Sequence, residues 1–282
     1  MGVNLLRVLV RRRYRIVLLL RKSSNTSEIS NIASFKRYDV ELTDLKAMLD
    51  TEKVDIILHC STNYGRKDVN PVSILEANLI LPLKLLQYGA ERNVACFINT
   101  DTVLDKRVSQ YSLSKSQFKE WLRLYSKTIK CINVALEHFY GPFDDETKFV
   151  TYIIHSIMRR VDHIDLTQGE QKRDFIYIDD VASAFDCIIN HHCDDLHGVG
   201  FIHYDVGTGR TIKIRDFAAL VKEIARNSRT QLNYGALPYR ENEVMDSHVD
   251  IKELKKLGWK AVVSLEEGIK KTMAIEEASG LQ

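Results

Sequence analysis

The chain carries a tyrosine and a lysine four residues apart in the stretch YSLSK, where Tyr111 and Lys115 stand in an expected helix. This spacing places both side chains on one helical face, one turn apart. Tyrosine ordinarily titrates at about pH 10, and a nearby ammonium would lower its pKa enough for general acid or base work. Thr100 ends an apolar run eleven residues earlier, and its hydroxyl could polarise a substrate carbonyl. Alone, the pair also fits a solvated helix surface.

Apolar runs and helical patterns indicate the elements that must position this pair. Runs that are apolar throughout recur at residues 16–20, 54–60, 95–100 and 131–136, with longer helical patterns at 74–90 and 111–127. Fully apolar strands separated by helices are typical of a parallel sheet covered on both faces. The sequence therefore predicts an α/β fold with a doubly wound parallel sheet, which binds ligands at the carboxyl ends of its strands.

The alternation of apolar strands and helices ends after GPFDDE at residues 141–146. Residues 148–173 read as one helix and a polar loop, and FIYI at 175–178 reads as a further strand. We expect a Rossmann-type dinucleotide-binding domain over residues 1–140 and 175–205. A smaller α/β substrate lobe should comprise residues 141–174 and 206–282.

The composition of the 282 residues is that of an ordinary soluble globular protein, with 45% hydrophobic and 28% charged residues. A net charge of +2 gives no reason to expect a nucleic-acid or membrane partner. The five cysteines lack repeated spacing, which favours buried thiols in a reducing compartment, and we expect a cytoplasmic protein. The stretch HHCDDLH at residues 191–197 has no second ligand pair at matching spacing, so we interpret it as a polar loop and expect no metal.

Several segments, in order along nearly the whole chain, resemble the extended short-chain dehydrogenase/reductase family. These are INTDT (98–102), YSLSK (111–115), EHFYGP (137–142), QKRDFIYIDDVA (171–182), YDVGTG (204–209) and LKKLGW (254–259). Members are NAD(P)-dependent epimerases, dehydratases and reductases of nucleotide sugars. The resemblance implies the same fold, a nicotinamide cofactor and a nucleotide-sugar substrate.

The resemblance also implies roles for individual residues. Thr100, Tyr111 and Lys115 would be the catalytic triad, with Lys115 also holding the nicotinamide ribose. The cofactor would further contact Gly2, Arg21, Asp39, Val40, Cys60, Ser61, Thr62 and Asn78. Arg21 stands where NAD-specific members carry an acid for the ribose 2′-hydroxyl. A cation there suits a 2′-phosphate, which favours NADPH over NAD(H), although a solvated strand-end charge is an alternative interpretation.

Substrate contacts are expected from Thr102, His138, Arg173 and Arg240. The two arginines match positions that pair with the nucleotide diphosphate, a role that suits a planar guanidinium. His138 replaces the usual asparagine of the family, and a buried core histidine is an equal alternative.

The resemblance within the family narrows the reaction. Dehydratases place Asp-Glu after the strand-end threonine, whereas this chain has Asp101-Thr102, which disfavours dehydration. The segments as a whole look most like the CDP-abequose and CDP-paratose synthases. These enzymes reduce the 4-keto group of CDP-4-dehydro-3,6-dideoxyglucose with NADPH in O-antigen synthesis. A dTDP-sugar 4-ketoreductase and a nucleotide-sugar epimerase stay open as alternatives. Because relatives dimerise through the tyrosine-bearing helix, a homodimer is a further hypothesis.

The chain opens inside the first helix of the family pattern, with Gly2 at the third glycine of the nucleotide-binding turn. The preceding strand and the first two glycines are not in the sequence. We expect a start placed at an internal methionine. The alternative is a truncated, inactive relative that only binds nucleotide sugar or a partner subunit. Arg13 also occupies a helix-end position where glycine would be easier.

Overall fold

The computed structural model describes residues 1–22, 24, 26, 29, 32, 35–66, 70–192 and 198–280. In these residues the helices are α1 (Gly2–Arg11), α2 (Leu45–Glu52), α3 (Pro71–Leu75), the π-helical η2 (Glu76–Ile80), α4 (Leu81–Glu91), α5 (Gln110–Tyr125), α6 (Phe149–Met158), α7 (Ile178–His192), α8 (Ile214–Ile224), α9 (Lys252–Lys256) and α10 (Leu265–Ala278). The strands are β1 (Val17–Leu20), β2 (Lys36–Asp39), β3 (Ile56–His59), β4 (Cys96–Thr102), β5 (Lys130–Leu136), β6 (His138–Tyr140), β7 (His163–Leu166), β8 (Lys172–Arg173), β9 (Phe175–Tyr177), β10 (Gly200–Val206), β11 (Ile212–Lys213) and β12 (Gln231–Tyr234).

The chain divides into two compact units. Unit 1 comprises Met1–Thr102, Ser109–Ala135 and Ala182–Tyr204, and unit 2 comprises Val103–Val108, Leu136–Val181 and Asp205–Gln282. The assignment of cofactor binding to the first part and substrate binding to the second stays a prediction.

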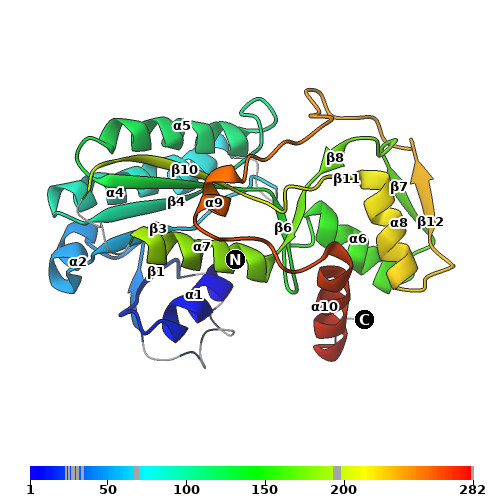
Figure 1. Ribbon diagram of the computed structural model, residues 1–282, viewed down its shortest axis with the longest axis horizontal. Helices are drawn as coiled ribbons and strands as arrows, with labels where there is room; N and C mark the ends of the chain where they lie inside the picture. Colours follow the sequence, from blue (N-terminus) through cyan, green and yellow to red (C-terminus); the bar gives the residue numbers. More distant parts are fainter. Residues whose placement is uncertain are drawn as a thin grey trace. The chain divides into compact units, whose positions relative to one another are not determined.

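Unit 1 is built on a sheet whose described strands follow the order β10-β5-β4-β3. β3 and β4 pair in parallel, with Ile56 opposite Cys96, and every residue of β5 is buried. Helices α4 and α5 lie along one face of this sheet, and α1 and α7 lie on the other (Figure 1). This covering explains why the strands are apolar throughout, and the predicted doubly wound α/β fold is confirmed.

The β1–β2 pair forms a separate parallel sheet in the described residues, with Leu20 opposite Asp39. Helix α1 precedes it, burying Leu5 and Leu6 as its apolar stripe predicts. Arg13 adopts a left-handed φ of 62°, as the sequence pattern suggested for this helix end. The Arg12 guanidinium anchors α1 by donating to both Asp186 carboxylate oxygens at 2.9 and 2.6 Å.

Unit 2 contains three strand pairs, β6–β9, β7–β12 and β8–β11, among its described residues. Helices α6, α8 and α10 pack against one another. The prediction of a polar loop before residue 173 is partly wrong, because that segment contains β7, which pairs in parallel with β12. Its sequence HIDL alternates exposed and buried positions, a strand signal too short to recognise without its partner.

Candidate active site

The tyrosine and the lysine stand in the first two turns of α5, as predicted. Ser109 caps this helix, because its hydroxyl accepts from the Ser112 amide at 3.1 Å, and the Ser112 hydroxyl accepts from the Ser109 amide at 3.1 Å. This reciprocal capping box fixes where the helix begins, and therefore on which face Tyr111 and Lys115 lie.

Lys115 is the most enclosed member of the predicted triad, with 1% of the residue exposed. Its Nζ donates to the main-chain oxygen of Thr100 at 2.9 Å. Burial lowers the pKa of Lys115 to about 8, because the ammonium loses hydration, while Asp101 and Cys60 act in the opposite direction. Lys115 is thus tied to β4 and titrates close to neutral pH.

Tyr111 has a raised pKa, which contradicts the expectation that the neighbouring ammonium lowers it. Burial is the main cause, Tyr64 and Asp101 add to it, and a hydrogen bond with the Thr102 side chain lowers the value. The Tyr64 ring lies 5.0 Å from the Tyr111 ring. The phenol is therefore the form present at neutral pH.

Thr100 and Thr102 belong to β4, whose last residue is Thr102. The prediction that Thr100 ends the strand is therefore wrong. Thr100 lies within β4, and 3% of the residue is exposed. Its carbonyl is the acceptor for Lys115, so the structure brings two members of the predicted triad into direct contact.

Asn78 lies in the π-helical segment and is fully buried. Its Oδ1 accepts from the Asn63 amide at 2.8 Å, and its Nδ2 donates to the Asn63 carbonyl at 2.8 Å and to Ser114 Oγ at 3.0 Å. Asn78 thus clamps the segment after β3 against α5. In the structure Asn78 therefore positions neighbouring elements. Its contact with the cofactor stays a prediction.

The segment Cys60, Ser61 and Thr62 follows β3 directly. The first residue of α1, Gly2, lies against it: a Cβ added to Gly2 would stand 3.8 Å from Cys60 Sγ. This is an ordinary contact distance, so packing alone does not require glycine there. The partial positive charge of a helix N-terminus and these polar side chains meet at this place.

Arg21, Asp39 and Val40 come together at the carboxyl end of the β1–β2 pair. The Val40 amide donates to the Leu20 carbonyl at 2.9 Å, which places Arg21 next to Val40 in register. Arg21 is exposed, and Asp39 Oδ1 accepts from the Glu41 amide at 2.9 Å.

The substrate-binding candidates His138, Arg173 and Arg240 belong to unit 2. The Arg173 guanidinium donates to the carbonyls of Lys172 and Val244 at 2.7 and 2.6 Å and also bonds to Glu243. Arg173 therefore holds the loop that contains Arg240, which is itself exposed.

His138 is half-buried and packs edge-on against the Phe175 ring. Its Nδ1 lies 2.8 Å from Oε2 of the fully buried Glu137, which also bonds to the Ser247 hydroxyl. The carboxylate fixes the orientation of the imidazole. The sequence assigned no role to Ser247, or to Glu137 although that residue opens the EHFYGP segment.

A polar row across the sheet of unit 1 was also missed from the sequence. It consists of His59, Asn99, Asp101 and Asn133, all buried. A signal for three of the four is a polar residue inside an apolar run, His59 in IILHC, Asn99 in FINT and Asn133 in CINVAL, whereas Asp101 follows its run.

No group of three or more potential metal ligands lies together in the described residues. Of the stretch HHCDDLH, His191 and His192 end α7, and residues 193–197 lie outside the described part. No described helix is both long and apolar enough to span a membrane.

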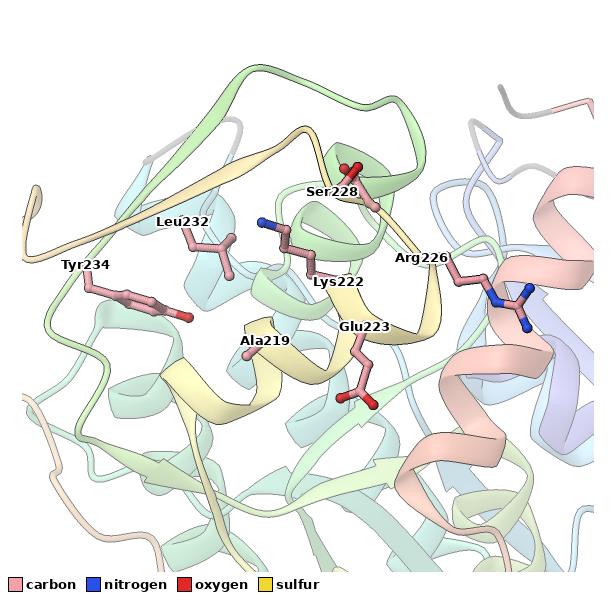
Figure 2. Close-up of a pocket in the computed structure, with 8 residues that line it drawn as sticks. Ala219, Lys222, Glu223, Arg226, Ser228, Leu232 and Tyr234 are labelled. Carbon is pink, nitrogen blue, oxygen red and sulfur yellow. The ribbon is translucent and has the colours of Figure 1, made fainter.

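Unit 2 has a surface depression formed by α8, the segment after it and β12 (Figure 2). Lys222, Glu223, Arg226 and Tyr234 are among its lining residues. None of the predicted site residues lines it, so it is not the candidate active site.

Comparison with known proteins agrees with the fold described above. CDP-abequose synthase from Salmonella muenchen is 32% identical over 288 residues, covering 98% of this chain and 94% of the relative. A putative UDP-glucose 4-epimerase from Methanocaldococcus jannaschii is 24% identical, covering 96% and 93%. The crystal structure of UDP-glucose 4-epimerase from Thermotoga maritima with UDP-glucose superimposes with a TM-score of 0.84 at 22% identity, covering 99% and 96%.

The family model described as "NAD dependent epimerase/dehydratase family" matches residues 1–207, which include α1, the sheet of unit 1 and the Tyr111–Lys115 pair. Because this model covers well over half of the chain and a relative is 32% identical over 98% of it, this chain belongs to the NAD dependent epimerase/dehydratase family.

Proposed function

We propose that this protein reduces the 4-keto group of a nucleotide-linked deoxysugar with NADPH. The observation that carries the proposal is the Tyr111–Lys115 pair: the tyrosine is a neutral phenol, and the lysine is anchored to Thr100 beside it. Reduction of a ketone to an alcohol requires one hydride and one proton, and a phenol can donate the proton.

The nicotinamide cofactor implied by the family fits the groups that unit 1 offers. The N-terminus of α1 suits a phosphate, and Cys60, which directly follows β3, lies at that helix end. Arg21 offers an exposed guanidinium beside Val40, which favours the 2′-phosphate of NADPH. When bound, the cofactor supplies the hydride.

The residues of this chain supply the remaining chemistry. Tyr111 donates its phenolic proton to the oxygen at C4, and Lys115 stabilises the resulting phenolate through its positive charge. The Lys115 ammonium has three N–H groups, and one is committed to the Thr100 carbonyl, which fixes the direction of the other two.

The substrate class follows from the relatives. Similarity to CDP-abequose synthases over 98% of the chain supports CDP-4-dehydro-3,6-dideoxyglucose as the first compound to test, with dTDP-4-keto sugars next. In unit 2, we assign His138 and Arg240 to substrate binding, and Arg173 to holding the loop of Arg240. We also propose a cytoplasmic location, because the five cysteines lack the repeated spacing of a disulfide framework.

The experiment begins with fluorescence titrations of the purified chain with NADPH and NADH, followed by incubation with the CDP sugar. We expect tighter binding of NADPH and loss of its absorbance as the alcohol forms. Tyr111→Phe should bind NADPH normally but react about 100- to 10,000-fold more slowly, because the proton donor is missing. Tyr125→Phe at the end of the same helix is the matched control and should react normally.

Three results would contradict the proposal. NADPH binding without turnover of either keto sugar would remove the reductase assignment. Conversion of the sugar with a trace of NAD, and with no net oxidation or reduction of the cofactor, would indicate an epimerase. Nucleotide-sugar binding without cofactor binding would support a non-catalytic relative.

A further inference from the structure

A chain of hydrogen bonds crosses the sheet of unit 1 below α5. His59 Nδ1 of β3 lies 3.0 Å from Asn99 Oδ1 of β4, and Asn99 Nδ2 donates to Asn133 Oδ1 of β5 at 2.9 Å. Asn133 Nδ2 then donates to Asp101 Oδ2, back on β4, at 2.8 Å. The four side chains thus link three neighbouring strands.

The direction of these bonds is determined by their chemistry. Because Asn99 Oδ1 can only accept, His59 Nδ1 must carry its proton, and each amide then donates onward through Nδ2. Hydrogen bonds aligned in one direction polarise one another and strengthen the last bond. The end of this chain is the carboxylate of Asp101.

Asp101 is held at both oxygens. Oδ1 accepts from the Thr102 amide at 2.8 Å, Oδ2 accepts from Asn133, and Lys119 Nζ lies 3.8 Å from Oδ2. Only 1% of its side chain is exposed. A buried carboxylate is costly unless hydrogen bonds compensate for lost hydration, so this one has a defined place and orientation.

The residues on either side of Asp101 contact the catalytic pair. The Thr100 carbonyl accepts from Lys115, and the Thr102 side chain shares a hydrogen bond with Tyr111. Asp101 acts on both groups in the same direction, because its negative charge raises the pKa of Lys115 and that of Tyr111. It therefore favours the protonated form of each.

We propose that Asp101 is a positioning residue: a fixed negative charge, oriented by Asn133 from the next strand, that holds Lys115 as an ammonium and Tyr111 as a phenol. The proposal rests on the proposed function insofar as a ketone reduction needs the phenol as proton donor. It adds a residue that acts through the catalytic pair without touching substrate.

The charged and titratable groups around Lys115, Tyr111 and Asp101 come from several elements. Burial lowers the pKa of His59 on β3 to about 3 and raises that of Cys60 just after β3, so both are uncharged at neutral pH. Lys119 of α5, a cation, lies 3.8 Å from Asp101 Oδ2, and the cation Arg66 lowers the pKa of Tyr111. Among these groups, Asp101 on β4 is the source of negative charge.

Two variants separate the charge of Asp101 from its hydrogen bonds. Asp101→Asn removes the charge but can place an amide donor against Asn133 Nδ2, which could impair folding. In the double variant Asp101→Asn with Asn133→Asp, the amide at position 101 can donate to the carboxylate at position 133. This variant keeps the net charge of the wild type but moves the carboxylate from β4 to β5. Asp50→Asn, a surface carboxylate paired with Arg92, is the matched control.

The measurement is an NMR titration of the Lys115 side chain in the intact, cofactor-free protein, with Lys115→Met to assign the signal. We expect the Lys115 midpoint to fall by about one pH unit in Asp101→Asn, to fall less in the double variant because its carboxylate stays on the neighbouring strand, and to stay unchanged in Asp50→Asn. An unchanged midpoint in whichever Asp101 variant folds, or an equal fall in Asp50→Asn, would overturn the proposal.

A kinetic measurement separates this proposal from the proposed function. If the chain is a ketoreductase, the loss of activity at high pH should move to lower pH in the Asp101 variants. If the NMR midpoint falls but the wild-type protein reduces no keto sugar, the proposed function fails and the effect of Asp101 on the pair stands.

Discussion

At the scale of single residues, burial determines the chemistry of this site more than charge pairing does. Spacing alone predicts that the Lys115 ammonium lowers the pKa of Tyr111, yet the pKa of Tyr111 is raised and that of Lys115 is lowered to about 8. Both changes favour the uncharged form, as expected when a group loses hydration. At neutral pH Tyr111 is therefore a phenol, the form that a proton donor must have, and Lys115, with a pKa of about 8, is still an ammonium.

His59 provides a residue-scale prediction about pH. Burial lowers its pKa from the ordinary 6.5 to about 3, so between these values the unfolded chain binds a proton that the folded protein does not. Stability contributed by neutral His59 is present above pH 6.5 and is lost as the pH falls toward 3. His59→Gln keeps a donor for Asn99 and does not titrate.

We expect the wild-type free energy of unfolding, relative to His59→Gln, to fall by about 1.4 kcal/mol per pH unit in this window. Urea unfolding at several pH values measures the difference. Exposed His248 is the control, since His248→Gln should give a parallel curve. A pH-independent difference for His59→Gln would mean that the pKa of His59 is the same in the folded and the unfolded protein.

At the scale of elements, two separate sequence motifs form one structure in unit 2. Asp174, of the QKRDF segment, is fully buried, and its Oδ1 accepts from the Thr208 amide at 3.0 Å and the Thr208 hydroxyl at 2.7 Å. Its Oδ2 accepts from the Gly209 amide at 2.7 Å. A Cβ on Gly207 would lie 2.8 Å from this oxygen, so the VGTG turn needs glycine there.

Removal of this carboxylate should destabilise the protein through the buried donors that it satisfies. We expect Asp174→Ala to lower the free energy of unfolding by about 3 kcal/mol, because the Thr208 and Gly209 amides lose their acceptor. Asp216→Ala, an exposed position in the first turn of α8, should cost less than about 1 kcal/mol. Chemical denaturation of both variants tests this, and equal losses would contradict it.

At the scale of the whole molecule, exposed apolar side chains gather on two helices of unit 1. Leu113, Trp121 and Leu124 of α5 and Val72 and Leu75 of α3 are all exposed, and these helices contact each other. The three α5 residues lie at helical spacing on one stripe. We propose that this stripe pairs with its copy in a homodimer, since symmetric self-association buries one apolar patch against itself.

The dimer predicts a change in mass on substitution. Light scattering at micromolar concentration should give twice the 32.5 kDa chain mass for the wild type and the monomer mass for Leu124→Glu. Leu42→Glu alters a side chain that is 83% exposed and away from α3 and α5 in sequence, and it should leave the dimer intact. A monomeric wild type would remove the dimer proposal.

The local pattern of the sequence determined much of this protein. Apolar runs and helical stripes predicted β3, β4, β5, α1 and α5, because burial on both faces of a sheet or on one stripe of a helix leaves a periodic signal. The spacing in YSLSK also placed Tyr111 and Lys115 on one face of α5. These properties depend on near neighbours in the chain.

Only the tertiary structure decided which distant groups contact each other and which protonation state each of them has. The chain from His59 to Asp101 joins three strands, and Asp174 meets a turn 34 residues later in the chain. The raised pKa of Tyr111 likewise comes from groups that fold around it. Hydrogen bonding and hydration depend on distances in space, which residue periodicity does not encode.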